Sequence, residues 1–139
     1  MGILPVLFYV FENLLRYVIM SVLEKKYGKD WWTTVTISRD IRDEFERRKK
    51  AEGRDRWVGK RGSHEIFYTD LGDLGLIINS NYGDFKDIFP NLTWIKSRVD
   101  DLEKSRNVLA HNNLLPNNEM KRIKIYLKDL QNQLTGKLK

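Results

Sequence analysis

The N-terminal segment ILPVLFYVFENLLRYVIMSVL, residues 3–23, restricts the possible folds most, because it is long and apolar enough to cross a membrane. Two charged residues, Glu12 and Arg16, lie near its middle, where a charge is costly in a bilayer. They are four residues apart and can pair on one face of a helix. The segment also lacks the basic start and the small-residue cleavage site of a signal peptide. We therefore expect no membrane association, and a helix over residues 5–27 that is buried in a core or a dimer interface.

Two further segments repeat apolar residues every three or four positions, which is the period of a helix. One seam comprises Leu92, Ile95, Val99, Leu102 and Leu109, and the other comprises Met120, Ile123, Leu127, Leu130 and Leu134. No segment alternates as a strand does, and no internal repeat is visible. The 139 residues suffice for one core. The sequence therefore predicts a single all-α domain over residues 1–139, built as a bundle of about four to six helices.

Polar residues that cap helices predict where several of them start. Helix starts are expected at Ser38, at Thr69 or Asp70, at Asn91, and at Asn117 or Asn118. A further short helix is expected over residues 84–89, before Pro90. Residues 29–35, KDWWTTV, are expected to form a connector whose two tryptophans anchor it to the core.

The segment that starts at Arg47, RRKKAEGRDRWVGKRGSHE, has no apolar period and predicts a helix end followed by a mobile basic loop. Residues 39–62 hold ten Lys and Arg against six Asp and Glu, so they carry most of the formal net charge of +6. Such a charge favours an anionic partner, for example nucleic acid, although many charge runs are only solvated surface.

Several classes of site are excluded or disfavoured by composition and spacing. The chain has no cysteine, which excludes disulfides and thiolate metal sites and fits a reducing, cytoplasmic setting. The segment GRDRWVGKR lacks the spacing and the hydroxyl residue of a phosphate-binding loop, and HEIFY lacks the second histidine of a zinc protease. We therefore predict no metal ion and no other cofactor. The alternative that the composition leaves open is a magnesium site made of carboxylates, although no acidic cluster lies beside Arg106 and His111 in the sequence.

The segment SRNVLAHNN, residues 105–113, does not fit simple packing, because Arg106 occupies the apolar seam between Leu102 and Leu109. An unpaired buried charge is expensive, so this arginine needs either a partner or a function. In one interpretation Arg106 forms a salt bridge to Glu12 across the bundle, and His111 only interacts with the end of the helix dipole.

In the other interpretation the same residues cleave RNA without a metal ion. An imidazole can transfer a proton near neutral pH, and a guanidinium can hold a phosphate and neutralise charge in the transition state. RNA supplies its own nucleophile, the 2′-hydroxyl group. Asn107 and His111 share a helix face, whereas Arg106 and His111 are about 140° apart around a helix. The latter two converge only if the helix frays at His111 or if a second copy completes the site.

The arrangement of Arg106, Asn107 and His111 resembles the Arg-x4-His motif of the HEPN superfamily. Residues 7–32, with Glu12, Leu15 and Arg16, are similar to the first helix of HEPN domains of the mRNA-surveillance-endonuclease type. Residues 94–120 look like their motif helix and the turn after it. Together these segments cover about a third of the chain.

This resemblance implies a helical domain that dimerises, so that two Arg/His motifs line one cleft. Members of the superfamily often cleave RNA without metal and serve as toxins, in phage defence or in RNA processing, and others only bind. HEPN toxins paired with a nucleotidyltransferase antitoxin usually carry tyrosine where this chain has Asn113. Control through modification of that tyrosine is therefore not expected here.

The sequence and the resemblance together predict a homodimeric, metal-independent endoribonuclease. His111 is the expected general acid and base, Arg106 the phosphate clamp and Asn107 the orienting residue, with Glu12 and Arg16 in support. The residues expected to bind the RNA backbone are Arg47, Arg48, Lys49, Lys50, Lys60 and Arg61, with the basic face of the last helix. The partners expected are RNA, a second copy of the chain and an antitoxin or another partner protein. The alternatives are a non-catalytic RNA-binding or regulatory HEPN module and a purely structural partner domain.

Overall fold

The computed structural model describes residues 3–110 and 117–138. Six α-helices occur in these residues: α1 (Ile3–Tyr27), α2 (Trp31–Thr34), α3 (Arg39–Arg54), α4 (Leu71–Ser80), α5 (Leu92–Ala110) and α6 (Asn117–Leu138). Three short 3₁₀ helices, η1 (Arg56–Val58), η2 (Glu65–Tyr68) and η3 (Tyr82–Asp84), lie between them. The described residues contain no strand, which confirms the all-α prediction.

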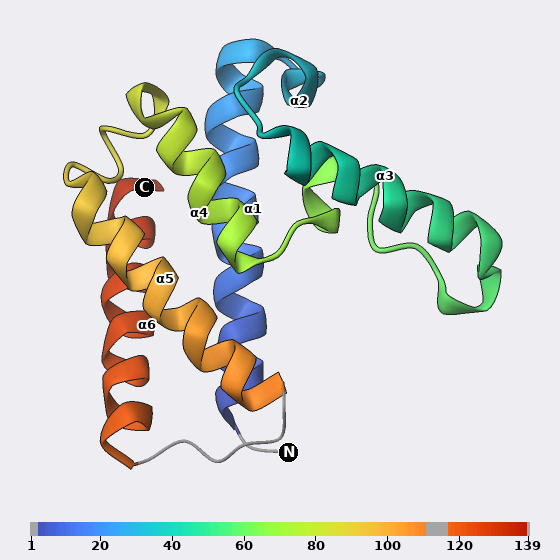
Figure 1. Ribbon diagram of the computed structural model, residues 1–139. Coiled ribbons are helices and arrows are strands. Elements are labelled where there is room, and N and C mark those ends of the chain that lie inside the picture. The colour runs from blue at the N-terminus through green and yellow to red at the C-terminus, as the bar shows by residue number, and fades with distance from the viewer. Residues whose placement is uncertain (1–2, 111–116, 139) are drawn as a thin grey trace.

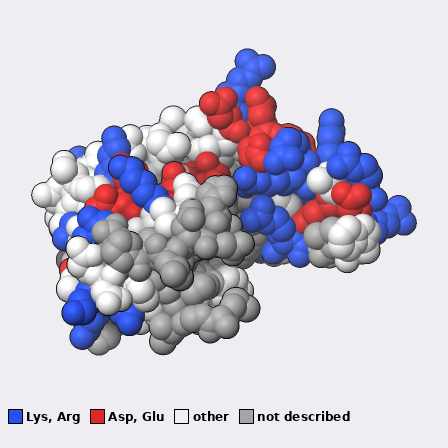
Figure 2. Space-filling model, turned by 60° about the horizontal axis from the view of Figure 1, so that its bottom comes forward, with Lys and Arg blue, Asp and Glu red and all other residues white. Residues whose placement is uncertain are grey.

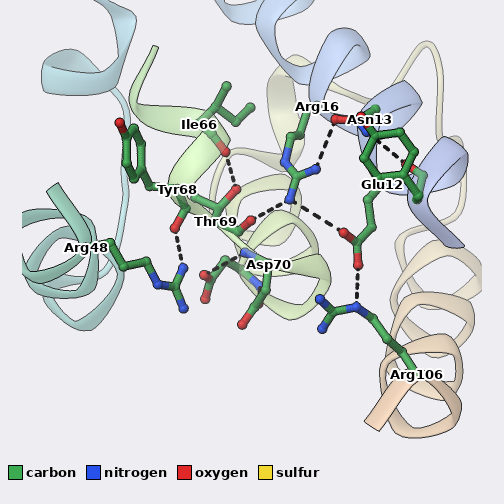
Figure 3. Close-up of polar contacts among 11 residues, drawn as sticks. Glu12, Asn13, Arg16, Arg48, Ile66, Tyr68, Thr69, Asp70 and Arg106 are labelled. Carbon is green, nitrogen blue, oxygen red and sulfur yellow. Dashed lines mark hydrogen bonds and ion pairs between the residues drawn. The ribbon is translucent and has the colours of Figure 1, made fainter. Parts of the chain in front are cut away.

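Helix α1 is central to the bundle, and it contacts α2, α4, α5 and α6 (Figure 1). Its apolar residues Leu15, Ile19 and Leu23 are completely buried. Both predicted seams face the same core, through Ile95, Val99 and Leu102 on α5 and through Ile123, Leu127 and Leu130 on α6. Burial of these seams places the end of α5 beside the first half of α1, where Arg106 and Glu12 lie (Figure 3).

Helix α4 starts where the sequence indicated, with Asp70 as its N-cap. The Asp70 side chain accepts a hydrogen bond from the backbone N–H of Asp73, and the Asp73 side chain accepts one from the backbone N–H of Asp70. This reciprocal capping box satisfies two N–H groups at the helix start. Asn91 likewise accepts a hydrogen bond from the backbone N–H of Trp94, which confirms the predicted start of α5.

Helices α4 and α5 approach each other closely at a glycine. A Cβ atom on Gly75 would lie 2.8 Å from Val99 Cγ1, so a larger residue there would force the two helices apart. The absence of a side chain at this position therefore sets the spacing of the helices that lead into the site.

Three predictions of local structure are wrong in detail. Residues 31–34 form the one-turn helix α2 rather than a plain connector, although Trp31 and Trp32 are buried as expected. Residues 84–89 do not form a helix: η3 ends at Asp84 and turns follow it. Helix α3 does not end near Arg47 but continues to Arg54, and it projects from the bundle with the chain that follows it (Figure 1).

The long apolar helix α1 contributes much of its surface to the core. Residues 6–27 form a helix that is long and apolar enough to cross a membrane: its most apolar stretch of 18 residues has a mean hydropathy of 1.6, and 44% of that stretch is buried within the protein. It is the one helix of this kind in the part of the chain that the structure describes.

Candidate active site

Arg106 lies near the end of α5, four residues after the fully buried Leu102. Its Nε is 2.8 Å from Oε1 of Glu12 on α1 (Figure 3). The Glu12 side chain is 9% exposed, whereas that of Arg106 is 40% exposed. The salt bridge expected between Arg106 and Glu12 is therefore confirmed, and it joins α5 to α1.

Arg16 is the second cation at the Glu12 carboxylate, and it lies deeper than Arg106. Its Nη2 is 3.6 Å from Oε2 of Glu12 and also donates a 2.6 Å hydrogen bond to the backbone carbonyl of Thr69. Its Nη1 donates to Oδ1 of Asn13 at 3.2 Å. Burial lowers the pKa of Arg16, and the Glu12 carboxylate opposes this shift. Arg16 thus fixes Glu12 and ties the start of α4 to α1, which makes it a positioning residue.

The contact between Glu12 and Arg106 leaves much of the guanidinium available. Oε1 of Glu12 is buried and accepts no hydrogen bond from the described residues, so its contact with Nε is an ion pair without hydrogen-bond geometry. The two terminal nitrogens of Arg106 point away from Glu12 in Figure 3, and no described residue accepts from them. The terminal N–H groups can therefore hold a second anion, and two of them form the planar fork that matches a phosphate.

A further acidic group, Glu103, lies on the same helix as Arg106 and interacts with its charge. Glu103, three residues earlier on α5, lies against α4 so closely that a Cβ atom on Gly72 would be 1.7 Å from its Oε2. Burial raises the pKa of Glu103, and the nearby Asp70, Asp100 and Asp73 raise it further. The charged form of Glu103 is therefore disfavoured in the folded protein.

Replacing Glu103 by glutamine should stabilise the protein at neutral pH. A raised pKa means that the folded protein binds the proton more tightly than the unfolded chain does, so the charged carboxylate costs stability. Native stability should recover as the pH falls through the raised pKa toward the ordinary value of 4.5. We expect a gain of about 0.5 kcal/mol at pH 7 that shrinks toward pH 5. Urea unfolding at both pH values measures it, and a variant that is less stable than wild type at pH 7 would contradict it.

The other expected catalytic residues are only partly located. Asn107 is exposed on α5, directly after Arg106. His111 and Asn113 lie outside the described residues, so the convergence of Arg106 and His111 stays a prediction. The second histidine of the chain, His64, is structural: it caps η2 through Nδ1, which accepts from the backbone N–H of Ile66, and its ring stacks on Trp31.

The first four predicted RNA-binding residues, Arg47, Arg48, Lys49 and Lys50, lie on α3 rather than in a loop. Arg48 pairs with Glu44 at 3.0 Å and donates a hydrogen bond to the backbone carbonyl of Tyr68. Its guanidinium is therefore engaged in contacts within the protein. Arg47 also pairs with Glu44. Lys50 is exposed on α3, as are Lys60 and Arg61 in the segment after it. Figure 2 shows Lys and Arg side chains, mixed with acidic ones, over the projecting part of the molecule.

The basic face predicted for the last helix is also present. Lys121, Lys124 and Lys128 are exposed on α6, whereas Arg122 lies 3.9 Å from Asp101 of α5. Within residues 3–110 and 117–138, no group of three or more His, Asp or Glu side chains is arranged to hold a metal ion.

Sequence reasoning missed two contributors to the site, Asn13 and the carbonyl of Thr69. Asn13 precedes Arg16 by three residues on one helix, so the helical period could have indicated the contact. The Thr69 carbonyl is 53 residues from Arg16 and has no side-chain signature. Only the packing of η2 and α4 against α1 brings it there.

The resemblance to HEPN domains predicts an all-α bundle with the arginine of the Arg-x4-His sequence on one of its helices. The structure has this arrangement: Arg106 lies on α5 and pairs with the buried carboxylate of Glu12 on α1. The family model described as Swt1-like HEPN matches residues 7–134. The chain therefore belongs to the Swt1-like HEPN family, which confirms the predicted superfamily. No curated protein and no solved structure matches the chain significantly.

Proposed function

We propose that this chain is a metal-independent endoribonuclease that acts as a homodimer. Membership of the Swt1-like HEPN family supports an RNA-related function. The observation that carries the proposal further is the state of Arg106: its Nε faces the buried Glu12, its side chain is 40% exposed, and no described residue accepts a hydrogen bond from its terminal nitrogens. A guanidinium held in this way is prepared to bind a phosphate with little loss of side-chain freedom.

In the proposed reaction His111 removes the proton from a ribose 2′-hydroxyl. The 2′-oxygen attacks the adjacent phosphorus, the bond from phosphorus to the 5′-oxygen breaks, and that oxygen takes up a proton from an imidazolium group, which the second copy of the motif can supply. Arg106 binds the phosphate oxygens and neutralises the additional negative charge of the transition state. Asn107 orients either group. The products are a 2′,3′-cyclic phosphate and a free 5′-hydroxyl.

An exposed stripe on α1 supports the dimer. Val6, Tyr9, Val10 and Tyr17 follow the helical period and are between 51% and 69% exposed. Asn13, a partner of Arg16, lies within the same stripe. A second copy bound there would cover apolar surface and would lie beside the Glu12–Arg106 pair.

Placing glutamates at Val10 and Tyr17 together should therefore produce a monomer. Two charges per copy would have to be buried in the interface, which is costly. Light scattering at micromolar concentration should show a dimer for wild type and a monomer for the variant, and RNA cleavage should fall with it. Ile125→Glu on α6, an equally exposed apolar position at 58%, is the matched control and should stay dimeric. A monomeric wild type that cleaves RNA would contradict the composite site.

The second candidate is a non-catalytic RNA-binding or regulatory HEPN module, or a structural partner domain. The Glu12–Arg106 ion pair favours it, because this contact alone suffices to explain why an arginine occupies an apolar seam. Incubation of pure protein with mixed RNA in EDTA separates the two candidates, since only the endoribonuclease cuts.

A cytoplasmic location and a role as a toxin, in phage defence or in RNA processing belong to the same proposal. A toxin would also need an antitoxin or another partner protein to restrain it.

A further inference from the structure

Trp57 is the most exposed large apolar side chain in the described residues, at 88%. The other three tryptophans are packed: Trp31 and Trp32 are buried, and Trp94 lies against the guanidinium of Arg98 at 4.2 Å. Contact of so much apolar indole surface with water is unfavourable, and an exposed ring of this kind often marks a binding site.

The turn that carries Trp57 is fixed to the rest of the protein. Trp57 lies in η1, directly after α3, and Gly59 reverses the chain with a φ of 81°. Glu52 on α3 accepts hydrogen bonds from the backbone N–H of Arg61 and from the hydroxyl of the buried Tyr68. These hydrogen bonds tie the segment after the turn to α3, so the turn holds the exposed indole in place. The indole would therefore lose little conformational entropy when it binds a ligand.

The surroundings of Trp57 are strongly basic. Residues 47–61 hold eight Lys and Arg against two Asp and Glu, and this surplus of six equals the net charge of the whole chain. A cleft of about 430 Å³ beside the turn is lined by Lys49, Glu52, Gly53, Arg56, Gly59 and Lys60. Arg56 directly precedes Trp57 in the sequence and Lys60 follows it by three residues, and both are exposed. Any ligand of this cleft should therefore carry negative charge.

We propose that Trp57 stacks on an unpaired base of single-stranded RNA while Arg56, Lys60 and Arg61 bind the phosphates beside that base. Stacking needs a base whose face is free, which a duplex does not offer, and any of the four bases can satisfy it. A protein partner would need a broader apolar surface, and Trp57 is the one exposed large apolar residue that the structure describes in this segment. The inference rests on the proposed function and names its substrate class, unpaired RNA.

The test measures binding separately from cleavage. A short, fluorescently labelled 2′-O-methyl oligonucleotide cannot be cut through its 2′-oxygen, so its fluorescence anisotropy reports binding alone. Wild type should bind this strand more tightly than the duplex formed with its complement. Trp57→Ala should weaken binding of the single strand about 5- to 100-fold, and Trp57→Phe should retain most of the affinity because a ring remains.

Salt dependence distinguishes the ring from the charges. Trp57→Ala should leave the slope of log affinity against log salt unchanged, whereas Arg56→Gln with Lys60→Gln should lower it by about 0.7 for each phosphate that the variant no longer neutralises. Ile125→Ala, which removes another exposed apolar side chain, is the matched control and should bind as wild type does. Circular dichroism should show each variant folded, since all of these positions are exposed.

Equal affinity of wild type and Trp57→Ala for the single strand would overturn the inference, as would equal affinity of wild type for strand and duplex. If wild type and Trp57→Ala bind the single strand equally well, the exposed ring would instead indicate a site for a protein partner. The catalytic proposal fails separately: binding that depends on Trp57 without cleavage of natural RNA refutes catalysis and keeps the stacking site. Conversely, cleavage of natural RNA together with binding that does not depend on Trp57 refutes the stacking site and keeps the catalytic proposal.

Discussion

Replacement of His111 by alanine should lower the rate of RNA cleavage about 10²- to 10⁴-fold, which is the usual effect of losing a positioned acid or base. Few other groups in this chain can replace it, because the only other histidine, His64, caps η2 and stacks on Trp31. The variant should remain folded and should still bind RNA, since Arg106 and the basic residues near α3 are unchanged. Single-turnover cleavage of a labelled RNA, measured beside a melting curve, gives both quantities.

Asn112→Ala is the matched control for His111→Ala, because it changes the adjacent position without removing a proton-transferring group. It should cleave at nearly the wild-type rate. An active His111→Ala protein would refute the assignment of the general acid and base. Equal losses in the two variants would mean that the shape of this segment matters and its imidazole does not.

The largest effect on stability should come from Glu12→Ala. Glu12 and Arg16 have side chains only 9% and 8% exposed, so removal of the carboxylate leaves a buried guanidinium without its anion. Breaking a buried pair in this way typically costs about 3–5 kcal/mol, a large part of the stability of a small domain. Urea unfolding measures the loss. Cleavage should fall as well, because Arg106 would lose the carboxylate that orients it.

Two comparisons isolate this effect. Glu24→Ala, on the same helix but less buried, should change stability by no more than about 0.5 kcal/mol. Arg106→Ala should cost about 1 kcal/mol or less, because its side chain is 40% exposed and Glu12 keeps Arg16 as a partner. A Glu12→Ala protein as stable as wild type would show that the pair is not important for the fold.

The seams of α5 and α6 were predictable because each buries one face, so the helical period appears directly in the order of residues. The end of α3 was not predictable in this way. Residues 47–54 bury almost nothing on the core side and therefore show no apolar period. Their helix is supported by charge pairs, Glu44 with Arg47 and Arg48, and by contacts with the distant Tyr68. Such contacts arise from the tertiary structure and leave no periodic signal.

The candidate site likewise contains contacts that the sequence predicts and contacts that arise only from the tertiary structure. A charge in an apolar seam requires a partner, so the pairing of Arg106 with Glu12 could be predicted from two positions on two expected helices. The backbone carbonyl of Thr69 carries no sequence signature, because every residue has one. Trp57 was visible in the sequence, but its exposure was not, since tryptophans in short connectors are more often packed, as Trp31 and Trp32 are.

The most direct test of the central proposal is the chemistry of the cut ends when pure wild-type protein is incubated with RNA in EDTA. The proposed mechanism predicts cleavage without any divalent ion, a 2′,3′-cyclic phosphate on the 5′ fragment and a free hydroxyl on the 5′ end of the other fragment. Mass spectrometry of the fragments identifies these ends. Cleavage that EDTA abolishes, or fragments that carry a 5′-phosphate, would contradict attack by the 2′-hydroxyl group and with it the roles assigned to Arg106 and His111.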